Sequence, residues 1–307
     1  MRLTLDEIRN SIQDGLLSFP VTDFDNNDRF NPSSFADRVE WFLKHDISAV
    51  FAAGGTGEFF SLSKDEYQQV VETSTSVVKN KVPVFSGAGR SIPEAVEFGS
   101  IAEKAGIDAL LLFPPYLADG PQEGIYNYAK AILQQVNLPV VYYNRSNGTL
   151  SAKYVVKLAN DCPNLIGLKD GTGNMQELND IIKTVGDRLI YIGGVPTAEI
   201  ISEAYLSIGV NTYSSAVFNF VPDLANHFYK SLRAGNKDVV NLILQKFYIP
   251  FVRLRGRQKG YAVSLVKAGV DIIGKSAGNV RAPLTMPTKE EVAELRTIIE
   301  NGEHLIK

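Results

Sequence analysis

The stretch Leu165-Ile166-Gly167-Leu168-Lys169-Asp170-Gly171-Thr172 is an apolar, strand-like run that ends on a lysine and passes into turn residues. Strands of a parallel sheet are covered on both faces, so their sequences are almost continuously apolar, and functional groups gather at their carboxyl ends. Strand alternation places Leu165, Gly167 and Lys169 on one face, where Gly167 leaves room for the lysine stem. Burial would lower the pKa of the amine and make Lys169 a nucleophile. The alternative is a solvated loop lysine, which this segment alone favours because lysine is rarely buried.

Seven further apolar runs share this character, and an amphipathic, helix-like stretch follows each of them. Their centres lie roughly 20–35 residues apart, the repeat of a strand and the crossover helix that parallel neighbours require. Eight such units close a barrel of about 250 residues. The eight runs are Leu16–Val21, Ala49–Ala53, Val82–Ser86, Ala109–Phe113, Pro139–Tyr143, Leu165–Lys169, Leu189–Gly193 and Val210–Tyr213. The pattern predicts an α/β fold, a (β/α)8 TIM barrel over residues 1–235, with an open doubly wound sheet as the main alternative.

Helix starts are well marked in this pattern. Ser63 and Ser91 are each followed by a glutamate three residues later, the signature of a capping box. From about Asn236 the strand pattern stops, and the chain is expected to form helices. These helices are Asp238–Tyr248, Tyr261–Ala268 and Lys289–Asn301. Residues 236–307 are therefore predicted to form a C-terminal helical extension, with no obvious linker before it.

Composition excludes several classes of partner. The net charge of −3 gives no electrostatic footprint for nucleic acid or for an anionic membrane. The one basic cluster, Arg253–Lys259, is expected to be a solvated turn and helix face. No apolar run approaches the ~20 residues that span a bilayer, and residues 1–7 lack a signal-peptide apolar region. The lone Cys162 allows no intramolecular disulfide, so we expect a cytoplasmic protein.

Several chemistries lack the residues that they need. The three histidines, His45, His227 and His304, share no metal-ligand spacing, so no metal site is predicted. There is no Gly-x-Ser-x-Gly elbow for a serine triad. Gly269–Ser276 matches the phosphate-loop pattern, but a helical stretch precedes it where the motif needs a strand. Nucleotide binding there is not expected.

Two other strand ends carry groups that suit a keto acid. After the second strand, the glycine-rich loop Gly54-Gly55-Thr56-Gly57-Glu58 could bind a carboxylate through its backbone amides. The fifth strand ends on Tyr142-Tyr143-Asn144-Arg145, which offers a phenol for proton transfer and a guanidinium that can hold a carboxylate. A glycine-rich turn, a core tyrosine and a surface arginine are the structural alternatives. In a barrel these ends meet that of Lys169, and an amine, a phenol and anion-binding amides together favour one active site.

These motifs, over almost the whole chain, resemble the dihydrodipicolinate synthase and N-acetylneuraminate lyase superfamily of Schiff-base aldolases and dehydratases. The resemblance implies that Lys169 is the Schiff-base lysine and Tyr143 the catalytic tyrosine. It also implies that Thr56 and Gly57 contribute to the pocket for the carboxylate beside the keto group. A homo-oligomer, either dimer or tetramer, and the absence of any cofactor are implied in the same way.

Within the superfamily the chain departs from the synthases. Their paired threonines before Gly-Glu become Gly55-Thr56, and the tyrosine that they contribute across a subunit interface corresponds to Leu117, so the synthase proton relay is broken. The motifs of residues 54–62, 143–147 and 276–284 are most similar to the branch of 5-dehydro-4-deoxyglucarate dehydratases, which form 2,5-dioxopentanoate, carbon dioxide and water. The substrate would be a keto sugar acid. Arg145 is the candidate for its distal end, or else Ser214, Ser215 and Asn219 near the eighth strand bind its hydroxyls.

Two other functions use the same residues or the same fold. A retro-aldol lyase of 2-keto-3-deoxy sugar acids would share the lysine and the tyrosine and differ in the bond that breaks. A catalytically silent sugar-acid-binding barrel belongs to a different class. Retention of both Lys169 and Tyr143 argues against the silent barrel, because binding alone requires no nucleophile.

Overall fold

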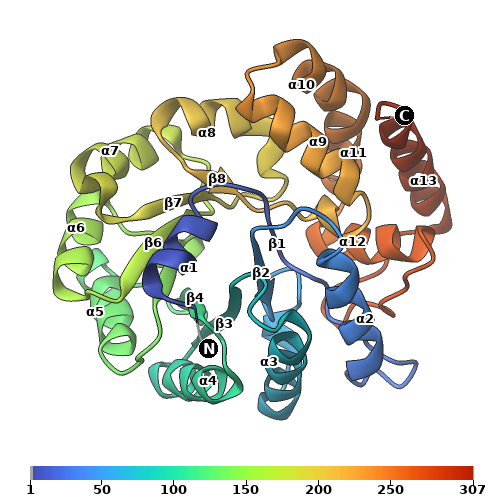
Figure 1. The fold of residues 1–307 in the computed structure, drawn as a ribbon. Coiled ribbons are helices and arrows are strands. Elements are labelled where there is room, and N and C mark those ends of the chain that lie inside the picture. The colour runs from blue at the N-terminus through green and yellow to red at the C-terminus, as the bar shows by residue number, and fades with distance from the viewer. Residues whose placement is uncertain (1–2, 307) are drawn as a thin grey trace.

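The computed structural model describes residues 3–306 as a ring of eight parallel strands surrounded by helices (Figure 1). Each strand pairs with the next in sequence. A bridge between Leu17 and Ser214, and a hydrogen bond of 2.9 Å from the Ser215 amide to the Leu17 carbonyl, join the last strand to the first. The strands are β1 (Leu17–Ser18), β2 (Ala49–Ala52), β3 (Val84–Arg90), β4 (Ala109–Pro115), β5 (Val140–Asn144), β6 (Leu165–Asp170), β7 (Ile190–Gly193) and β8 (Thr212–Tyr213). The predicted (β/α)8 barrel is confirmed, and the open sheet is excluded.

Every predicted run overlaps a strand, but the first strand is shorter than predicted. The run Leu16–Val21 is regular only at β1, because the side chain of Asn219 takes over the backbone pairing beyond it. Its amide nitrogen donates to the Phe19 carbonyl at 2.9 Å, and its oxygen accepts from the Val21 amide at 3.0 Å. The chain there leaves the sheet and forms part of the wall above the barrel.

Two apolar cores lie on the two sides of the strands. One fills the barrel interior, and the other lies between the strands and the helices. In β6 the register shifts, because Val140 pairs with Leu165 and Val141 pairs with Gly167. Leu165 consequently packs in the outer core, and the prediction that it shares a face with Lys169 was wrong. A Cβ at Gly167 would lie 3.3 Å from interior Val141, so this glycine faces the interior as predicted.

The helices of the barrel alternate with the strands and cover them from outside (Figure 1). They are α2 (Pro32–Phe42), α3 (Lys64–Val78), α4 (Ile92–Ala105), α5 (Gln122–Leu133), α6 (Ala152–Asp161), α7 (Met175–Val185), α8 (Ser202–Ile208) and α9 (Pro222–Arg233). The predicted capping boxes at Ser63 and Ser91 are both present. An additional helix, α1 (Leu5–Ser11), lies across the barrel, where its Ile8 packs in the interior core together with Ile12, the residue after the helix.

The residues after α9 form the predicted helices, which pack against the barrel without a separate core. They are α10 (Lys237–Ile243), a π-helical turn η6 (Leu244–Tyr248), α11 (Ile249–Arg255), α12 (Tyr261–Ile272) and α13 (Lys289–Glu303). The outer core continues through them. Residues 269–272 form the end of α12, so the phosphate-loop match begins inside a helix and does not follow a strand. Residues 1–2 and 307, which the predicted ranges 1–235 and 236–307 include, lie outside the described part.

Within 3–306, no helix combines the length and the apolar character that crossing a bilayer requires.

A buried ion pair joins the C-terminal helical extension to the loop after β2. Lys267 of α12 lies 2.9 Å from the carboxylate of Glu58, and both side chains are fully buried. The second carboxylate oxygen of Glu58 accepts the Arg281 amide at 2.9 Å, and the Lys267 amine also donates to the Asn279 carbonyl at 2.8 Å. Glu58 directly follows Gly55, Thr56 and Gly57, so the extension holds the candidate carboxylate-binding loop in place.

Replacing Lys267 with methionine should therefore destabilise the fold strongly. The substitution leaves the Glu58 carboxylate buried without its counter-charge, which typically costs about 3–5 kcal/mol. Urea unfolding would measure the loss. Lys64→Met is the matched control, because the Lys64–Glu97 pair is exposed and its removal should change little. Glu58→Gln combined with Lys267→Met should recover part of the stability, and an unchanged midpoint for Lys267→Met alone would contradict this account.

Candidate active site

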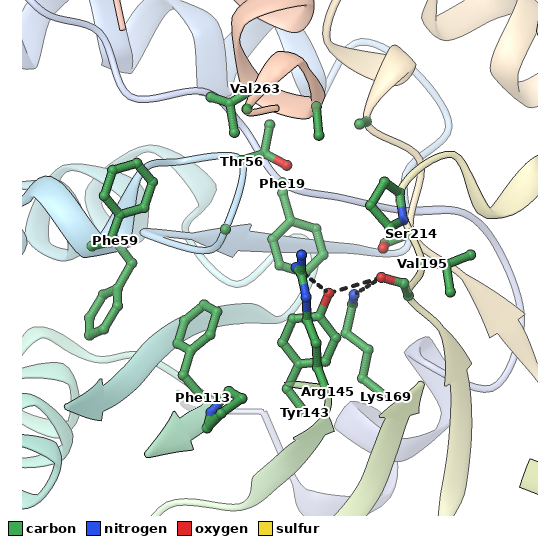
Figure 2. A pocket seen from close by; sticks show the side chains of 18 of the residues that line it. Phe19, Thr56, Phe59, Phe113, Tyr143, Arg145, Lys169, Val195, Ser214 and Val263 are labelled. Atoms are coloured by element: carbon green, nitrogen blue, oxygen red, sulfur yellow. Dashed lines mark hydrogen bonds between the residues drawn. The ribbon is translucent and has the colours of Figure 1, made fainter. Parts of the chain in front are cut away.

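A cavity of about 510 Å³ opens at the carboxyl ends of the strands. Lys169, Tyr143 and Arg145 line it together with Gly55 and Thr56, so the structure brings together the three strand ends singled out in the sequence (Figure 2). The rest of its wall is largely apolar and includes the aromatic side chains of Phe19 and Phe59, from the βα loops, and of Phe113, from β4. Such a wall limits the water around the polar groups and strengthens their electrostatic interactions.

Lys169 points into this cavity from the end of β6. Its side chain is only 4% exposed, and its Nζ atom donates to the Gly194 carbonyl at 3.1 Å. The amine lies 4.0 Å from the ring centroid of Tyr143 and 5.3 Å from that of Phe19. Burial lowers the pKa of Lys169 below its ordinary value, and the charge of Arg145 acts in the same direction against the opposing effect of Tyr143. The amine is thus suited to act as a nucleophile in its free form.

Gly194 is a functional residue that the sequence analysis missed. Its carbonyl oxygen accepts hydrogen bonds from both Lys169 and the Tyr143 hydroxyl, the latter at 2.9 Å. A Cβ at this position would lie 2.2 Å from the lysine Nζ atom, so a side chain would displace the amine. The adjacent pair Gly193-Gly194 at the end of an apolar strand was the available signal, because such glycines mark a close approach to the backbone.

The two tyrosines at the end of β5 face opposite sides of the sheet. Tyr143 points into the barrel, whereas Tyr142 packs in the outer core and donates to the Gly148 carbonyl. Burial raises the pKa of Tyr142. Burial would also raise the pKa of Tyr143, but the charges of Lys169 and Arg145 outweigh it and hold that pKa below the ordinary value. Tyr143 is therefore the tyrosine that can exchange a proton beside the amine.

Arg145 lies over Tyr143 at the rim of the cavity (Figure 2). One guanidinium nitrogen donates to the Tyr143 hydroxyl at 3.2 Å. Gly171 makes this approach possible, since a Cβ there would lie 2.6 Å from the tyrosine ring and 2.8 Å from the arginine. The guanidinium thus favours the phenolate form of Tyr143 and remains accessible to a ligand.

Asp170 fixes the turn that follows the lysine. Its carboxylate accepts the backbone amides of Thr172 at 2.9 Å and Gly173 at 3.1 Å. The hydroxyl of Tyr205, on α8, donates to the same carboxylate at 2.6 Å. These bonds hold the end of β6 rigidly and so define the direction of the Lys169 side chain.

Not every residue of the glycine-rich loop lines the cavity. Gly55 and Thr56 line it. Gly57 lies behind them, where its carbonyl accepts the Thr22 hydroxyl at 2.6 Å and a Cβ would lie 3.1 Å from the Pro20 carbonyl. Gly57 therefore shapes the loop, and the two residues before it are the ones that face the cavity.

Of the three polar residues predicted near the eighth strand, only Ser214 lines the cavity. Ser215 is buried behind it and donates to the Glu199 carboxylate at 2.6 Å. Asn219 is likewise buried, with its amide engaged by the backbone near β1. The structure thus assigns Ser215 and Asn219 to the supporting wall and leaves Ser214 facing the cavity.

The basic cluster at 253–259 is not uniformly solvated as expected. Arg253, Arg257 and Lys259 are exposed, but Arg255 is half-buried and lines the cavity. Its guanidinium donates to the hydroxyl of Thr197, another lining residue. The difference arises because helix α11 presents only one face to the barrel, and sequence alone did not show which arginine lies on it.

Across residues 3–306, no group of three or more histidine, cysteine, aspartate or glutamate side chains is placed to hold a metal ion.

Comparison with known proteins gives consistent results. The model of the dihydrodipicolinate synthetase family matches residues 13–302. A protein from Rhizobium rhizogenes, described as a probable 5-dehydro-4-deoxyglucarate dehydratase, is 50% identical over 296 residues, which cover 96% of this chain and 98% of that one. A protein from Allorhizobium ampelinum with the same description is 50% identical over 295 residues, again 96% and 98% of the two chains.

A solved structure supports the fold independently. Dihydrodipicolinate synthase from Oceanobacillus iheyensis superimposes with a TM-score of 0.89 over 97% of this chain and 100% of the other. The two sequences are 23% identical, so this likeness bears on the architecture alone.

Tyr143→Phe should lower kcat by about 10²–10⁴-fold, the range typical of losing a general acid-base group, with the fold intact. Tyr142→Phe is the matched control, because that hydroxyl lies in the outer core away from the amine. Steady-state kinetics with circular dichroism on both variants would check this. Equal losses, or the reverse ranking, would contradict a proton-transfer role for Tyr143.

Proposed function

The chain belongs to the dihydrodipicolinate synthetase family, and we propose that within this family it is a Schiff-base lyase that dehydrates and decarboxylates 5-dehydro-4-deoxyglucarate. The observation that carries the choice of reaction is the 50% identity, over nearly the full length of both chains, to proteins described as dehydratases of that substrate. The buried amine of Lys169 beside Tyr143 supplies the chemistry that such a reaction requires.

Covalent capture of the substrate is the first step of this proposal. The free amine of Lys169 attacks the C5 ketone, and loss of water gives a protonated imine. The carboxylate next to the ketone is held at Gly55 and Thr56, where the loop faces the cavity. Tyr143, within reach of the amine and with a lowered pKa, exchanges the protons that imine formation and hydrolysis require.

Elimination and decarboxylation then follow from one electron sink. The iminium acidifies the C4 protons, and removal of one of them by Tyr143 or a water allows the C3 hydroxyl to leave as water. The iminium is now conjugated through C4 and C3, so the C1–C2 bond can break and its electrons reach the nitrogen as carbon dioxide departs. Protonation, tautomerisation of the C2 enol and imine hydrolysis give 2,5-dioxopentanoate and free Lys169. The imine nitrogen receives all the electrons, so the sequence of steps calls for neither a metal nor an organic cofactor.

The oligomeric state belongs to the same proposal. Tyr116 and Leu117, in the loop after β4, are 71% and 81% exposed, and Phe60 nearby in the cavity rim is 49% exposed. Large exposed apolar side chains around a pocket mark an interaction surface. We assign that surface to a second copy of this chain, in a dimer or tetramer.

We also place the protein in the cytoplasm, because its single cysteine allows no intramolecular disulfide and fits a reducing compartment.

Sedimentation analysis should find a dimer or a tetramer. Leu117→Asp should shift the oligomeric state toward the monomer, because the substitution would bury a carboxylate in the apolar contact. Leu242→Asp, on α10, is the control, since Leu242 is also exposed, at 43%, but lies away from the rim. A monomeric wild-type protein would contradict the assignment.

Incubation with 5-dehydro-4-deoxyglucarate should release one carbon dioxide per substrate and form 2,5-dioxopentanoate, also in the presence of chelator. NMR of the products together with carbon dioxide detection would measure this. Pyruvate as the main product, without carbon dioxide, would move the chain to retro-aldol chemistry, and binding without turnover would indicate a silent barrel.

Borohydride trapping tests the imine separately from the products. Reduction in the presence of substrate should fix mass on Lys169, and Lys169→Met should abolish both the adduct and turnover. Lys275→Met is the control, because Lys275 packs on Trp41 outside the cavity lining. A label on another lysine, or turnover with no adduct, would contradict the covalent mechanism.

A further inference from the structure

The C-terminal extension forms one wall of the cavity. Its lining residues are Phe251, Arg255, Gly260, Ala262, Val263 and Leu284. Arg255 is the charged member of this set, and the others offer only apolar surface or backbone. A guanidinium placed in an otherwise apolar wall has few interactions with water and attracts an anion strongly.

Arg255 is held in a defined position by the loop after β7. Its guanidinium donates to the Thr197 hydroxyl. Thr197 is buried and has a left-handed backbone conformation, with φ of 56°, which few non-glycine residues adopt. Strain of this kind collects at functional sites, where the surrounding structure holds it.

The same loop also holds the reacting groups. Gly194, at its beginning, binds Lys169 and Tyr143 through its carbonyl, and Thr197, three residues later, binds Arg255. Three residues of extended chain span at most about 10 Å. The imine-forming amine and the guanidinium are therefore bound at the two ends of one short segment, and both line the same cavity. Ser214 lines the cavity as well and offers a hydroxyl donor.

We propose that Arg255 binds the carboxylate at the end of the substrate distant from the imine and so selects dicarboxylates over monocarboxylates. The identity of this substrate class rests on the function proposed above. The assignment replaces Arg145 as the candidate for the distal end.

The other two arginines that line the cavity have different tasks. Arg145 donates to the Tyr143 hydroxyl and adjusts its acidity. Arg90 donates to the carbonyls of Phe59 at 3.2 Å and Leu62 at 2.7 Å and pairs with Glu94 at 3.8 Å. Arg255 makes no comparable contact with the reacting groups, and its remaining donors are available to a ligand.

The surroundings of Arg255 also suit a carboxylate that must leave as carbon dioxide. Glu199 is buried behind the wall and bonded to Ser215, and burial raises its pKa to about 7, so near neutral pH it is partly ionised and only part of its charge acts on Arg255. Tyr213 and Tyr248 also face Glu199. A guanidinium with a nearby carboxylate holds a substrate anion less firmly than an isolated one. The C1 carboxylate is thereby recognised without being stabilised so strongly that loss of its charge becomes prohibitive.

The binding of two matched keto acids tests whether Arg255 recognises the distal carboxylate. 2-Oxoadipate has the carbon chain, the ketone and both carboxylates of the substrate but no hydroxyls, and 2-oxohexanoate lacks the distal carboxylate. By calorimetry, the wild-type protein should bind 2-oxoadipate at least about 10-fold more tightly. Arg255→Gln should weaken the binding of 2-oxoadipate by about 10- to 100-fold. The dissociation constant of 2-oxohexanoate should stay within about threefold of the wild-type value. Arg255→Lys should retain part of the preference, because it keeps the charge and loses the planar fork.

Arg253→Gln is the control on the same helix, since this arginine is exposed, and both dissociation constants should stay unchanged. Arg145→Gln tests the rival site. A preference that survives in Arg255→Gln and disappears in Arg145→Gln would overturn the proposal, as would a wild-type protein without any preference. The readout requires no turnover, so a diacid preference that depends on Arg255 would stand even if product analysis gave pyruvate, and the two proposals can fail separately.

Discussion

Two hydrogen bonds meet at the carbonyl oxygen of Gly194, one from the amine of Lys169 and one from the hydroxyl of Tyr143. They bring the two groups together from neighbouring strands and give the buried amine a polar partner that carries no charge. A carboxylate in that place would have stabilised the ammonium form and raised the pKa of the lysine. A neutral acceptor keeps the amine oriented while burial still lowers its pKa. The proposed role of Lys169 as a nucleophile depends on this arrangement.

The C-terminal extension supports the loops that surround the cavity at the carboxyl ends of the strands. Strand ends supply the reacting groups, but the loops that surround them need support from outside the ring. Lys267 provides it for the glycine-rich loop through Glu58, and Arg255 meets the loop after β7 at Thr197. The shared apolar core makes these contacts rigid, because the helices cannot move without opening it. The extension is thus part of the site, although its helices contain none of the reacting groups.

Local pattern was sufficient for the barrel, because its period can be read directly, whereas Lys169 was singled out only together with the groups at the other strand ends. The local pattern did not determine which side chains of a strand point into the barrel and which point outward. Leu165 was assigned to the wrong side because one residue inserted opposite Val140 and Val141 reverses the alternation, and nothing in the apolar run marks such a bulge. The sequence put forward Ser215 and Asn219 as groups that bind substrate hydroxyls, but in the structure both side chains bond to other groups of the protein.

The sequence by itself determined the eight strand-helix units and the helical extension, since both follow from periodicity, and it singled out Lys169 once the residue types at the other strand ends were considered with it. The family resemblance, and not the strand pattern, chose Tyr143 over Tyr142. The tertiary structure alone decided that Gly194 receives both the amine and the Tyr143 hydroxyl, and which arginine of the basic cluster enters the cavity. The physical reason is the same in each case. These relations join residues from different strands, loops and helices, and contacts between distant segments are set by the packing of the whole ring and its extension.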